Sequence, residues 1–248
     1  MALCSLEVLS HNFLEDILSF WFSHIDNIDN IIAPDVEDAM PWFSQDDAYD
    51  RACITNFGTQ LEQIKSIEAS GMKILSIARP STPLHWISLI ILLDQLPRNC
   101  YRGNKAGVAY RVFDKMALEI ALRAIELGIP GHLPVRFRVA YSFWFFMPLE
   151  HAESLQMQQM VTEHHANLFR ECEMLMDGSI DAGDTDVAHC RSVLLKRRIH
   201  YEKFKDALRG ICNEHKDTIR LFGRYPRRNK VLNRSSTEAE LAYLQEQS

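Results

Sequence analysis

The sequence predicts an all-α protein, organised as a single domain of antiparallel helices over residues 1–248. Apolar residues recur at helical spacing along most of the chain. Strand signals are almost absent, because no Asn-Gly or Asp-Gly pair separates two alternating runs. Glycine and proline, at 10 and 9 of the 248 residues, are sparse and fall mostly at expected helix ends. These observations favour a packed array of helices over a sheet.

The N-terminal half is expected to contain helices separated by short loops. The first, at residues 14–22, carries apolar residues spaced for one face of a helix. An acidic segment at 26–38 is poorly periodic and is expected to be a loop. Later helices are expected after Trp42, at 83–95 behind the start signal Ser-Thr-Pro, and at 104–127 before a glycine cap.

The C-terminal half is expected to be helical as well. Its expected elements are, in order, a central buried aromatic helix at 137–146, a long helix at 150–176, a flexible loop at 177–186 and one or two helices within 191–221. Thr237 and Glu240 have the spacing of a capping box, which predicts a last short helix.

The composition indicates a chain that can bury a large core. Hydrophobic residues make up 47% of the sequence and charged residues 24%, which argues against disorder. No stretch of 18 or more apolar residues is free of charge, so no membrane span is expected. The first residues, 1–7, have no basic region and include an acid, which argues against a secretion signal. We therefore expect a cytoplasmic protein.

The net charge of −6 conceals a strong asymmetry along the chain. Residues 191–234 hold 14 of the 27 Lys and Arg residues against 4 acids, so this tract carries +10 and the remainder −16. Neither an aromatic-interleaved basic patch nor a zinc-finger spacing accompanies the tract, and no nucleic-acid partner is expected. We expect it to pair with the acidic N-terminal half or to line an anion-accepting pocket.

The sequence predicts neither a metal site nor a cofactor. Six cysteines lie at positions 4, 53, 100, 172, 190 and 212 without a Cys-x-x-Cys pair, so free buried thiols in a reducing compartment are expected. The segment 46–50, Asp-Asp-Ala-Tyr-Asp, matches the aspartate-rich pattern with which terpene cyclases hold magnesium-diphosphate. Acids are also expected at a helix start, and no second metal motif follows, so helix capping is the preferred interpretation. His164 and His165 are adjacent and would point to different faces of a helix, which makes them a poor metal pair.

The segment 94–103, Asp-Gln-Leu-Pro-Arg-Asn-Cys-Tyr-Arg-Gly, is the first with chemical potential. A buried helix end that carries Asp94, Arg98 and Arg102 is costly unless these groups satisfy one another or a ligand. The pattern predicts either a structural Asp–Arg network or a corner whose guanidiniums bind a carboxylate, a phosphate or a polarised carbonyl. Asn99 and Tyr101 lie in the same turn and are candidate substrate-binding residues.

A second segment, 147–153, places a histidine between acids at a helix start. Glu150 and Glu153 are favoured there by the helix dipole alone. His151 is expected to be either a capping or network histidine or a general base poised by a carboxylate.

A third segment, 220–229, contains four arginines interleaved with Phe and Tyr at a helix end. It predicts either a solvated basic loop or an arginine cluster that faces the corner formed by Asp94 and Glu150. Arg224 is a candidate catalytic residue of such a cluster, and Tyr225 and Arg228 are candidate substrate contacts.

Several motifs follow one another in a fixed order along most of the chain. They are Phe20-Trp-Phe, Trp42-Phe, Tyr49-Asp, the segments 93–103, 147–153 and 222–229, and Arg234 with Ser236-Thr. In these motifs the chain resembles the all-helical, tetratricopeptide-like family catalogued as domain of unknown function 924, found in bacteria and fungi. The resemblance implies that fold and carries little information on activity.

The chain departs from the pattern of this family at some positions. Ala152 stands where the family usually has Ser, and Arg227 where it usually has His. Ser88 occupies a buried-helix position where an apolar residue is expected. These departures indicate a diverged, fungal member that keeps the scaffold while its pocket serves another ligand.

The resemblance further implies a cofactor-independent cyclase or isomerase of specialised metabolism. Divergent fungal members are recruited as cyclases of the Diels–Alder type, such as a norbornene-forming synthase of a diterpenoid pathway. Such a reaction needs an apolar cavity that folds a terpenoid-like substrate and a donor that polarises its polar handle. The expected donors and cavity walls are Arg98, Arg102, Arg224, Trp86, Phe143 and Phe146.

Two other functions are compatible with the same residues. One is a tetratricopeptide-like interaction module that binds peptides on a concave surface. The other is a hydrolase in which Glu150 and His151 act on a small ester or phosphate. An enclosed cavity reached by Arg98 and Trp86 would favour an enzyme, whereas an open groove with exposed aromatic side chains would favour the module.

Overall fold

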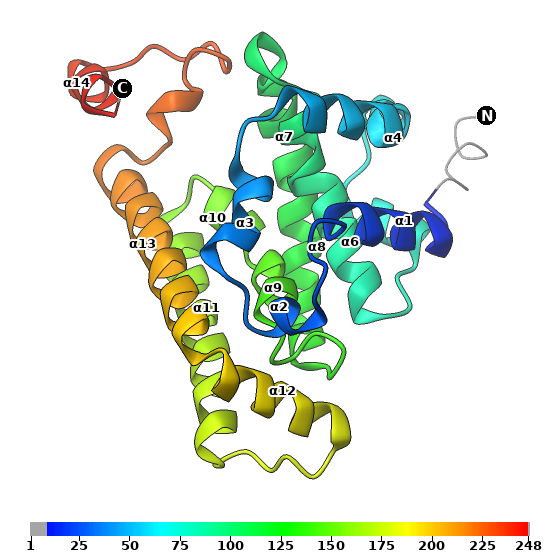
Figure 1. Ribbon diagram of the computed structural model, residues 1–248. Helices are drawn as coiled ribbons and strands as arrows, with labels where there is room; N and C mark the ends of the chain where they lie inside the picture. The colour runs from blue at the N-terminus through cyan, green and yellow to red at the C-terminus, as the bar shows by residue number, and fades with distance from the viewer. Residues whose placement is uncertain (1–8, 248) are drawn as a thin grey trace.

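The computed structural model describes residues 9–247, and it confirms the all-α architecture (Figure 1). No strand occurs anywhere in residues 9–247. The expectation about a secretion signal and the residue Cys4 lie outside the described residues. None of the helices within 9–247 combines the length and the apolar character needed to cross a membrane.

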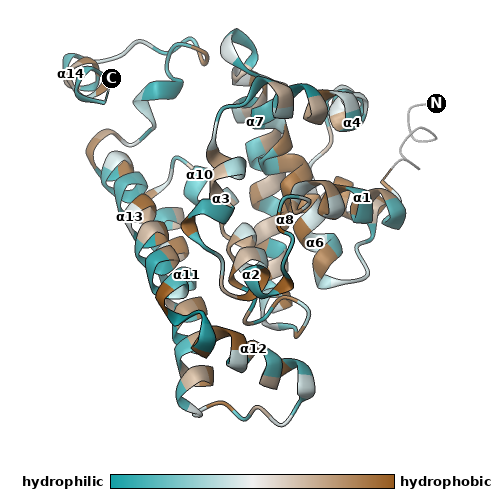
Figure 2. Ribbon diagram, in the orientation of Figure 1, coloured by the Kyte–Doolittle hydropathy of each residue, from teal (hydrophilic) through white to brown (hydrophobic). Residues whose placement is uncertain are grey.

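Helix α6 (Pro83–Asp94) lies at the centre of the molecule. Thr82 caps it by accepting a hydrogen bond from the His85 backbone amide, and every residue from His85 to Asp94 is buried. The helix packs between α1 (His11–Trp21) and α8 (Asp114–Glu126). Figure 2 shows hydrophobic residues concentrated in this region. A helix that is apolar on all sides fits such a position, because it has no face for solvent.

The acidic segment at 26–38 is helical for much of its length, so the prediction of a loop is wrong. It contains α2 (Ile28–Ile32) and the start of α3 (Val36–Phe43). Asn27 and Asp35 occupy the N-cap positions of these helices. Helices of five and eight residues span too few turns to show a clear apolar periodicity. The polar residues that suggested a loop include the N-cap residues of these two helices.

The aspartates at 46–50 begin a helix, as expected. Asp46 accepts hydrogen bonds from the backbone amides of Ala48 and Tyr49 at the start of α4 (Asp47–Ser66). Helix α5 (Gly71–Ala78) then packs on α8, and α4 packs on the short helix α7 (Leu96–Cys100). The capping interpretation of Asp46 is therefore confirmed.

The middle of the chain is helical but more broken than expected. Between residues 103 and 114 a 3₁₀ turn and a π-helical segment, Ala109–Phe113, precede α8. The aromatic segment forms α9 (Val139–Ser142) and a 3₁₀ turn, Phe143–Phe145, in place of one long helix. Its burial is as expected, since the side chains of Phe143 to Phe145 are completely covered. Tight aromatic packing overrides helical regularity here.

The C-terminal helices form an arm along one side of the molecule (Figure 1). After α10 (Met147–His151) the chain continues in three long helices and a short one, which are α11 (Leu155–Asp177), α12 (Thr185–Lys196), α13 (Arg198–Phe222) and α14 (Glu238–Glu246). The connection between α11 and α12 falls within the expected loop. Thr237 and Glu240 form the expected capping box.

The basic tract pairs with acids from the N-terminal half, in line with one of the two expectations. Nη2 of Arg197 lies 2.8 Å from Oδ2 of Asp35, which is the cap of α3. Arg228 lies near Asp114 in the same way. The cysteines within residues 9–247 are all free, and all but Cys100 are buried.

Candidate functional site

Residues from three of the predicted segments and from α8 meet at one place, and we call this group the arginine–carboxylate cluster. Its members are Asp94, Arg98, Asp114, His151 and Arg228. They come from the end of α6, the short helices α7 and α10, the start of α8 and the turn after α13. The structure thus brings together segments that are far apart in the sequence.

Asp94 and His151 form the centre of the cluster. Nδ1 of His151 lies 2.8 Å from Oδ1 of Asp94, whose side chain is completely buried. The second oxygen of Asp94 accepts a hydrogen bond from the Gln95 side chain. A donor at Nδ1 leaves the lone pair of Nε2 available, and Nε2 has no hydrogen-bond partner among residues 9–247.

The surroundings favour a neutral imidazole beside an ionised carboxylate. Burial lowers the pKa of His151, and the charge of Arg98 adds to this, outweighing the attraction of Asp94. Burial alone would raise the pKa of Asp94, but the interactions with His151 and Arg98 outweigh burial and leave this pKa lowered. A neutral histidine oriented by a carboxylate is the arrangement of a general base.

The two arginines of the cluster share one carboxylate. Nη2 of Arg98 lies 2.8 Å from Oδ1 of Asp114, and Nη1 of Arg228 lies 3.3 Å from Oδ2. The Arg98 contact is a close ion pair. The Tyr110 ring lies under the Arg228 guanidinium at 4.5 Å and within 5.8 Å of that of Arg98.

The π-helical segment explains how Tyr110 and Asp114 reach the arginines. The extra residue in a π-helical turn shifts the following side chains around the helix, and such turns often occur at functional sites. The side chains of Arg98, Asp114 and His151 keep exposures of 16%, 13% and 14%. These side chains are therefore partly accessible to solvent, and two carboxylates balance the two guanidiniums.

Other residues of the segment 94–103 lie in a separate network. Arg102 forms two hydrogen bonds with the carboxylate of Asp50, at 2.8 and 2.9 Å, and Asn99 donates to the same carboxylate at 2.8 Å. The Tyr101 hydroxyl donates to Glu62 at 2.8 Å. These contacts fit the structural Asp–Arg network, because the charges of Arg102 and Asp50 are paired with each other.

Arg224 is also held by a partner outside the cluster. It forms two hydrogen bonds with Glu240 of α14, and these with the capping amide of Thr237 lower the pKa of Glu240 to about 2. Tyr225 is buried and its hydroxyl donates to the backbone oxygen of Glu150. The four arginines of the segment 220–229 thus have different partners, and Arg228 is the one that enters the cluster.

Glu150 and His151 face different environments despite being neighbours. Glu150 is completely buried, and Oε2 lies 3.1 Å from Nδ1 of His215. Its other oxygen lies 3.6 Å from Nδ1 of His165. His151 therefore contacts Asp94 and not Glu150, and Glu150 belongs to a second group of residues on α10, α11 and α13.

The aromatic candidates lie in the core or close to it. Phe143 is completely buried against Trp144, and Phe146 stacks on His164 with ring centroids 5.0 Å apart. Trp86 is buried on α6. Arg227, one of the departures from the family pattern, is not in the cluster either, since it is exposed and reaches His215 at 3.4 Å.

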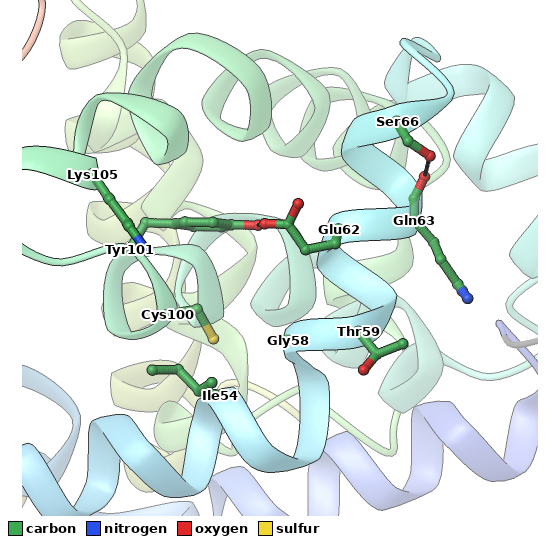
Figure 3. A pocket seen from close by; sticks show the side chains of 9 residues that line it. All are labelled: Ile54, Gly58, Thr59, Glu62, Gln63, Ser66, Cys100, Tyr101 and Lys105. Atoms are coloured by element: carbon green, nitrogen blue, oxygen red, sulfur yellow. Dashed lines mark hydrogen bonds between the residues drawn. The ribbon is translucent and has the colours of Figure 1, made fainter.

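Four cavities stand out in the part of the chain that the structure describes, with volumes of about 760, 220, 210 and 70 Å³. Figure 3 shows the first of them, where Tyr101 and Glu62 point toward one another near Lys105. None of the four is lined by Asp94, Arg98, His151 or Trp86. The cavity expected at Arg98 and Trp86 is not among them.

Sequence reasoning missed several residues that matter here. Asp114 and Tyr110 are four positions apart on one helical face, which is a signal that both serve the same neighbour. Asp50 appeared only as part of an aspartate-rich motif. Nothing in the sequence indicated that His165, Cys212 and His215 lie together, because their proximity depends on the packing of separate helices.

Comparison with known proteins identifies the family and the fold. The family described as a bacterial protein of unknown function, DUF924, matches residues 17–248. The chain is similar to a solved structure, a protein of unknown function, ATU0120, from Agrobacterium tumefaciens. The two are 24% identical with a TM-score of 0.55, over 95% of this chain and 98% of that one. No functionally curated protein matches the chain. The family match covers nearly the whole sequence, and the chain therefore belongs to the DUF924 family.

Proposed function

We propose that the protein is a small-molecule enzyme of the isomerase or cyclase class that works by proton transfer at the arginine–carboxylate cluster. His151 removes or returns the proton, and Asp94 orients it. The observation that carries the proposal is the 2.8 Å contact between Nδ1 of His151 and Oδ1 of Asp94, with Nε2 left without a partner. General bases of this kind contribute about 10²- to 10⁴-fold to a rate.

The arginines supply the second requirement of such a reaction. Removing a proton next to a carbonyl places negative charge on its oxygen, and positive groups held in advance stabilise that charge. Arg98 and Arg228 both contact the Asp114 carboxylate, and Arg98 and His151 both contact Oδ1 of Asp94. The carbonyl or carboxylate group of a substrate would bind to these guanidiniums alongside Asp114.

A finer form of the proposal is the intramolecular Diels–Alder cyclisation that the family resemblance implies. It would use Arg98 as a donor to the polar handle and would need no base. It would also need a cavity for an apolar, terpenoid-like substrate, and the 760 Å³ cavity includes Glu62, Gln63 and Lys105 in its lining. We place proton transfer first because the His151–Asp94 pair has a role only in that reaction.

The test uses deuterium, so the substrate need not be known in advance. The protein is incubated in D₂O with a panel of carbonyl compounds and with cell extract, and mass spectrometry follows each compound. Proton transfer predicts deuterium uptake on a carbon of the substrate or product. A cycloaddition predicts an unchanged mass with a new retention time, and hydrolysis predicts the gain of water.

Matched histidine variants show whether the cluster is responsible. His151→Gln is expected to abolish deuterium uptake, while His164→Gln, outside the cluster, is expected to retain it. Uptake that survives His151→Gln in a folded protein contradicts the proposal. Turnover without any deuterium uptake would support the cycloaddition in its place.

A further inference from the structure

A second group of reactive side chains lies on the other side of α10 from His151. Glu150 on α10, His165 on α11 and Cys212 on α13 each offer one atom, and these atoms lie within 4.8 Å of one another. All three residues are buried. The three helices pack side by side (Figure 1), so their spacing is fixed by the fold.

The polar atoms of this group lack the partners that burial demands. Oε1 of Glu150 and both ring nitrogens of His165 make no hydrogen bond. Oε1 of Glu150 and Nδ1 of His165 are 3.6 Å apart, which is too long for a hydrogen bond. Buried polar atoms without partners are costly, and binding an ion is one of the usual ways in which they are satisfied.

We propose that Glu150, His165 and Cys212 bind a divalent transition-metal ion, and that Zn²⁺ fits this ligand set best. A thiolate, an imidazole and a carboxylate are the three ligand types that zinc takes in proteins. Hard ions such as Mg²⁺ and Ca²⁺ prefer oxygen ligands alone, so the sulfur of Cys212 selects against them.

The spacing is close to that of a tetrahedral site. Metal–ligand bonds of about 2.0–2.3 Å place the ligand atoms about 3.3–3.8 Å apart. The Glu150–His165 distance of 3.6 Å already falls in this range. The group as a whole spans up to 4.8 Å, so binding requires the ligand atoms to move together by about 1 Å.

Neighbouring side chains hold two of the three ligands. His215 contacts Oε2 of Glu150 at 3.1 Å, which leaves Oε1 for the metal. The Thr162 hydroxyl lies 3.6 Å from Sγ of Cys212. Contacts of this kind orient metal ligands and raise their affinity.

The fourth coordination position opens to a cavity of about 220 Å³. His165 and Cys212 line it together with Arg209, Asn213, Thr162 and Ala166. Three protein ligands with an open position are typical of zinc sites that hold a water molecule or a substrate atom. Arg209 is exposed at this cavity, and its charge favours a small oxyanion on the metal.

The inference is independent of the proposed function. Glu150 and His151 are adjacent in sequence, but His151 contacts Asp94 while Glu150 faces α11 and α13. The zinc site can therefore be present or absent whatever the arginine–carboxylate cluster does.

The test begins with the full-length protein stripped by a chelator and titrated with ZnCl₂ or CoCl₂. We expect one ion per chain and one proton released for each ion bound, because the Cys212 thiol ionises while His165 binds as a neutral ring. Cobalt should give an intense near-ultraviolet band from thiolate-to-metal charge transfer. A wild-type protein that binds neither ion, or binds cobalt without this band, overturns the proposal.

Variants then assign the ligands. Cys212→Ser and His165→Gln are each expected to weaken zinc binding more than about 100-fold, and His215→Gln, as a positioning residue, by about 10-fold. Cys100→Ser and His164→Gln are matched controls that should bind like the wild type. Circular dichroism confirms folding, and Glu150→Gln replaces any variant that fails to fold. Unchanged zinc affinity in folded Cys212→Ser contradicts the assignment.

Discussion

His151 and Asp94 are joined by a 2.8 Å contact across 57 residues of sequence, and this contact links α10 to the end of the central helix α6. Asp94 is completely buried, so its charge depends on His151, Gln95 and Arg98 for stabilisation. The same contact that orients the imidazole therefore also holds the core together.

Replacing Asp94 should affect both activity and stability. Asp94→Asn removes a completely buried charge and leaves the partly buried Arg98 with one carboxylate fewer, and breaking such a pair costs up to about 3–5 kcal/mol. It also removes the acceptor that fixes the His151 tautomer, so turnover should fall at least about 10²-fold. Urea unfolding and deuterium uptake measure the two effects. The exposed Asp47→Asn is the control, and wild-type turnover in Asp94→Asn would remove the role given to the pair.

The pH dependence of activity follows from the lowered pKa of His151. Only the neutral ring can accept a proton, and burial holds the pKa of His151 below its ordinary value of about 6.5. We expect a constant rate from neutral pH to below about pH 6.5, and then a fall as the pH drops through the lowered pKa. Initial rates of deuterium uptake, corrected for solvent exchange, give this profile. A decline that begins above pH 7 would contradict it.

Stability should also decrease on acidification, for a related reason. Burial lowers the pKa of His85, His151, His164 and His165, so below about pH 6.5 the unfolded chain binds protons that the folded chain does not. The free energy of unfolding then falls as the pH drops from about 6.5 toward the lowered pKa values. Urea midpoints of the metal-free protein, measured from about pH 7.5 to about pH 5, test this. In His165→Gln the slope should be smaller, and an equal slope would count against its buried neutral state.

Most of the fold follows from local sequence signals, and its exceptions have physical reasons. The stripe on α1, the proline start of α6 and the capping box of α14 each act within one helix, so the sequence predicts them directly. The prediction of a loop at 26–38 is wrong because very short helices show almost no apolar periodicity. The prediction of one continuous helix at 137–146 is wrong because the packing of Phe143 against its neighbours outweighs local helix geometry.

The candidate site was only partly predictable because proximity is a property of the whole fold. Asp94, Arg98 and Arg228 were recognisable as buried or clustered charges. The sequence does not show that Arg102 and Arg224 turn away to Asp50 and Glu240. A partly buried arginine needs an acidic partner. Which acid becomes that partner depends on which distant helix packs beside the arginine.

Arg102 and Arg224 should therefore behave as structural residues. Arg102→Ala leaves the buried carboxylate of Asp50 with Asn99 as its remaining partner, which should cost roughly 1–3 kcal/mol. Arg224→Ala removes the ion pair that ties Glu240 of α14 to the turn after α13, and it should speed amide hydrogen exchange in α14. Turnover per folded molecule should match the wild type in both variants. A loss of turnover above 10-fold (about 1.4 kcal/mol in the activation barrier) in a fully folded variant would show that the replaced arginine takes part in catalysis.

Gly107 sets the position of the turn that carries Arg228. A Cβ at this glycine would lie 2.5 Å from the backbone oxygen of Val231 and 2.6 Å from the Arg111 side chain. Gly107→Ala must therefore move the segment after α13, which lengthens the contact between Arg228 and Asp114. We expect a loss of roughly 1–3 kcal/mol together with reduced turnover.

Gly210 provides the matched control for that substitution. It lies inside α13, and an added Cβ would meet nothing within 4 Å. Gly210→Ala should therefore stabilise the protein by about 0.5–1 kcal/mol through helix propensity and leave turnover unchanged. Thermal unfolding and deuterium uptake of the two variants separate the effect of added volume at the Arg228 turn from the general effect of replacing a glycine. If Gly107→Ala were as stable and active as Gly210→Ala, the close approach of Val231 would not control the placement of Arg228.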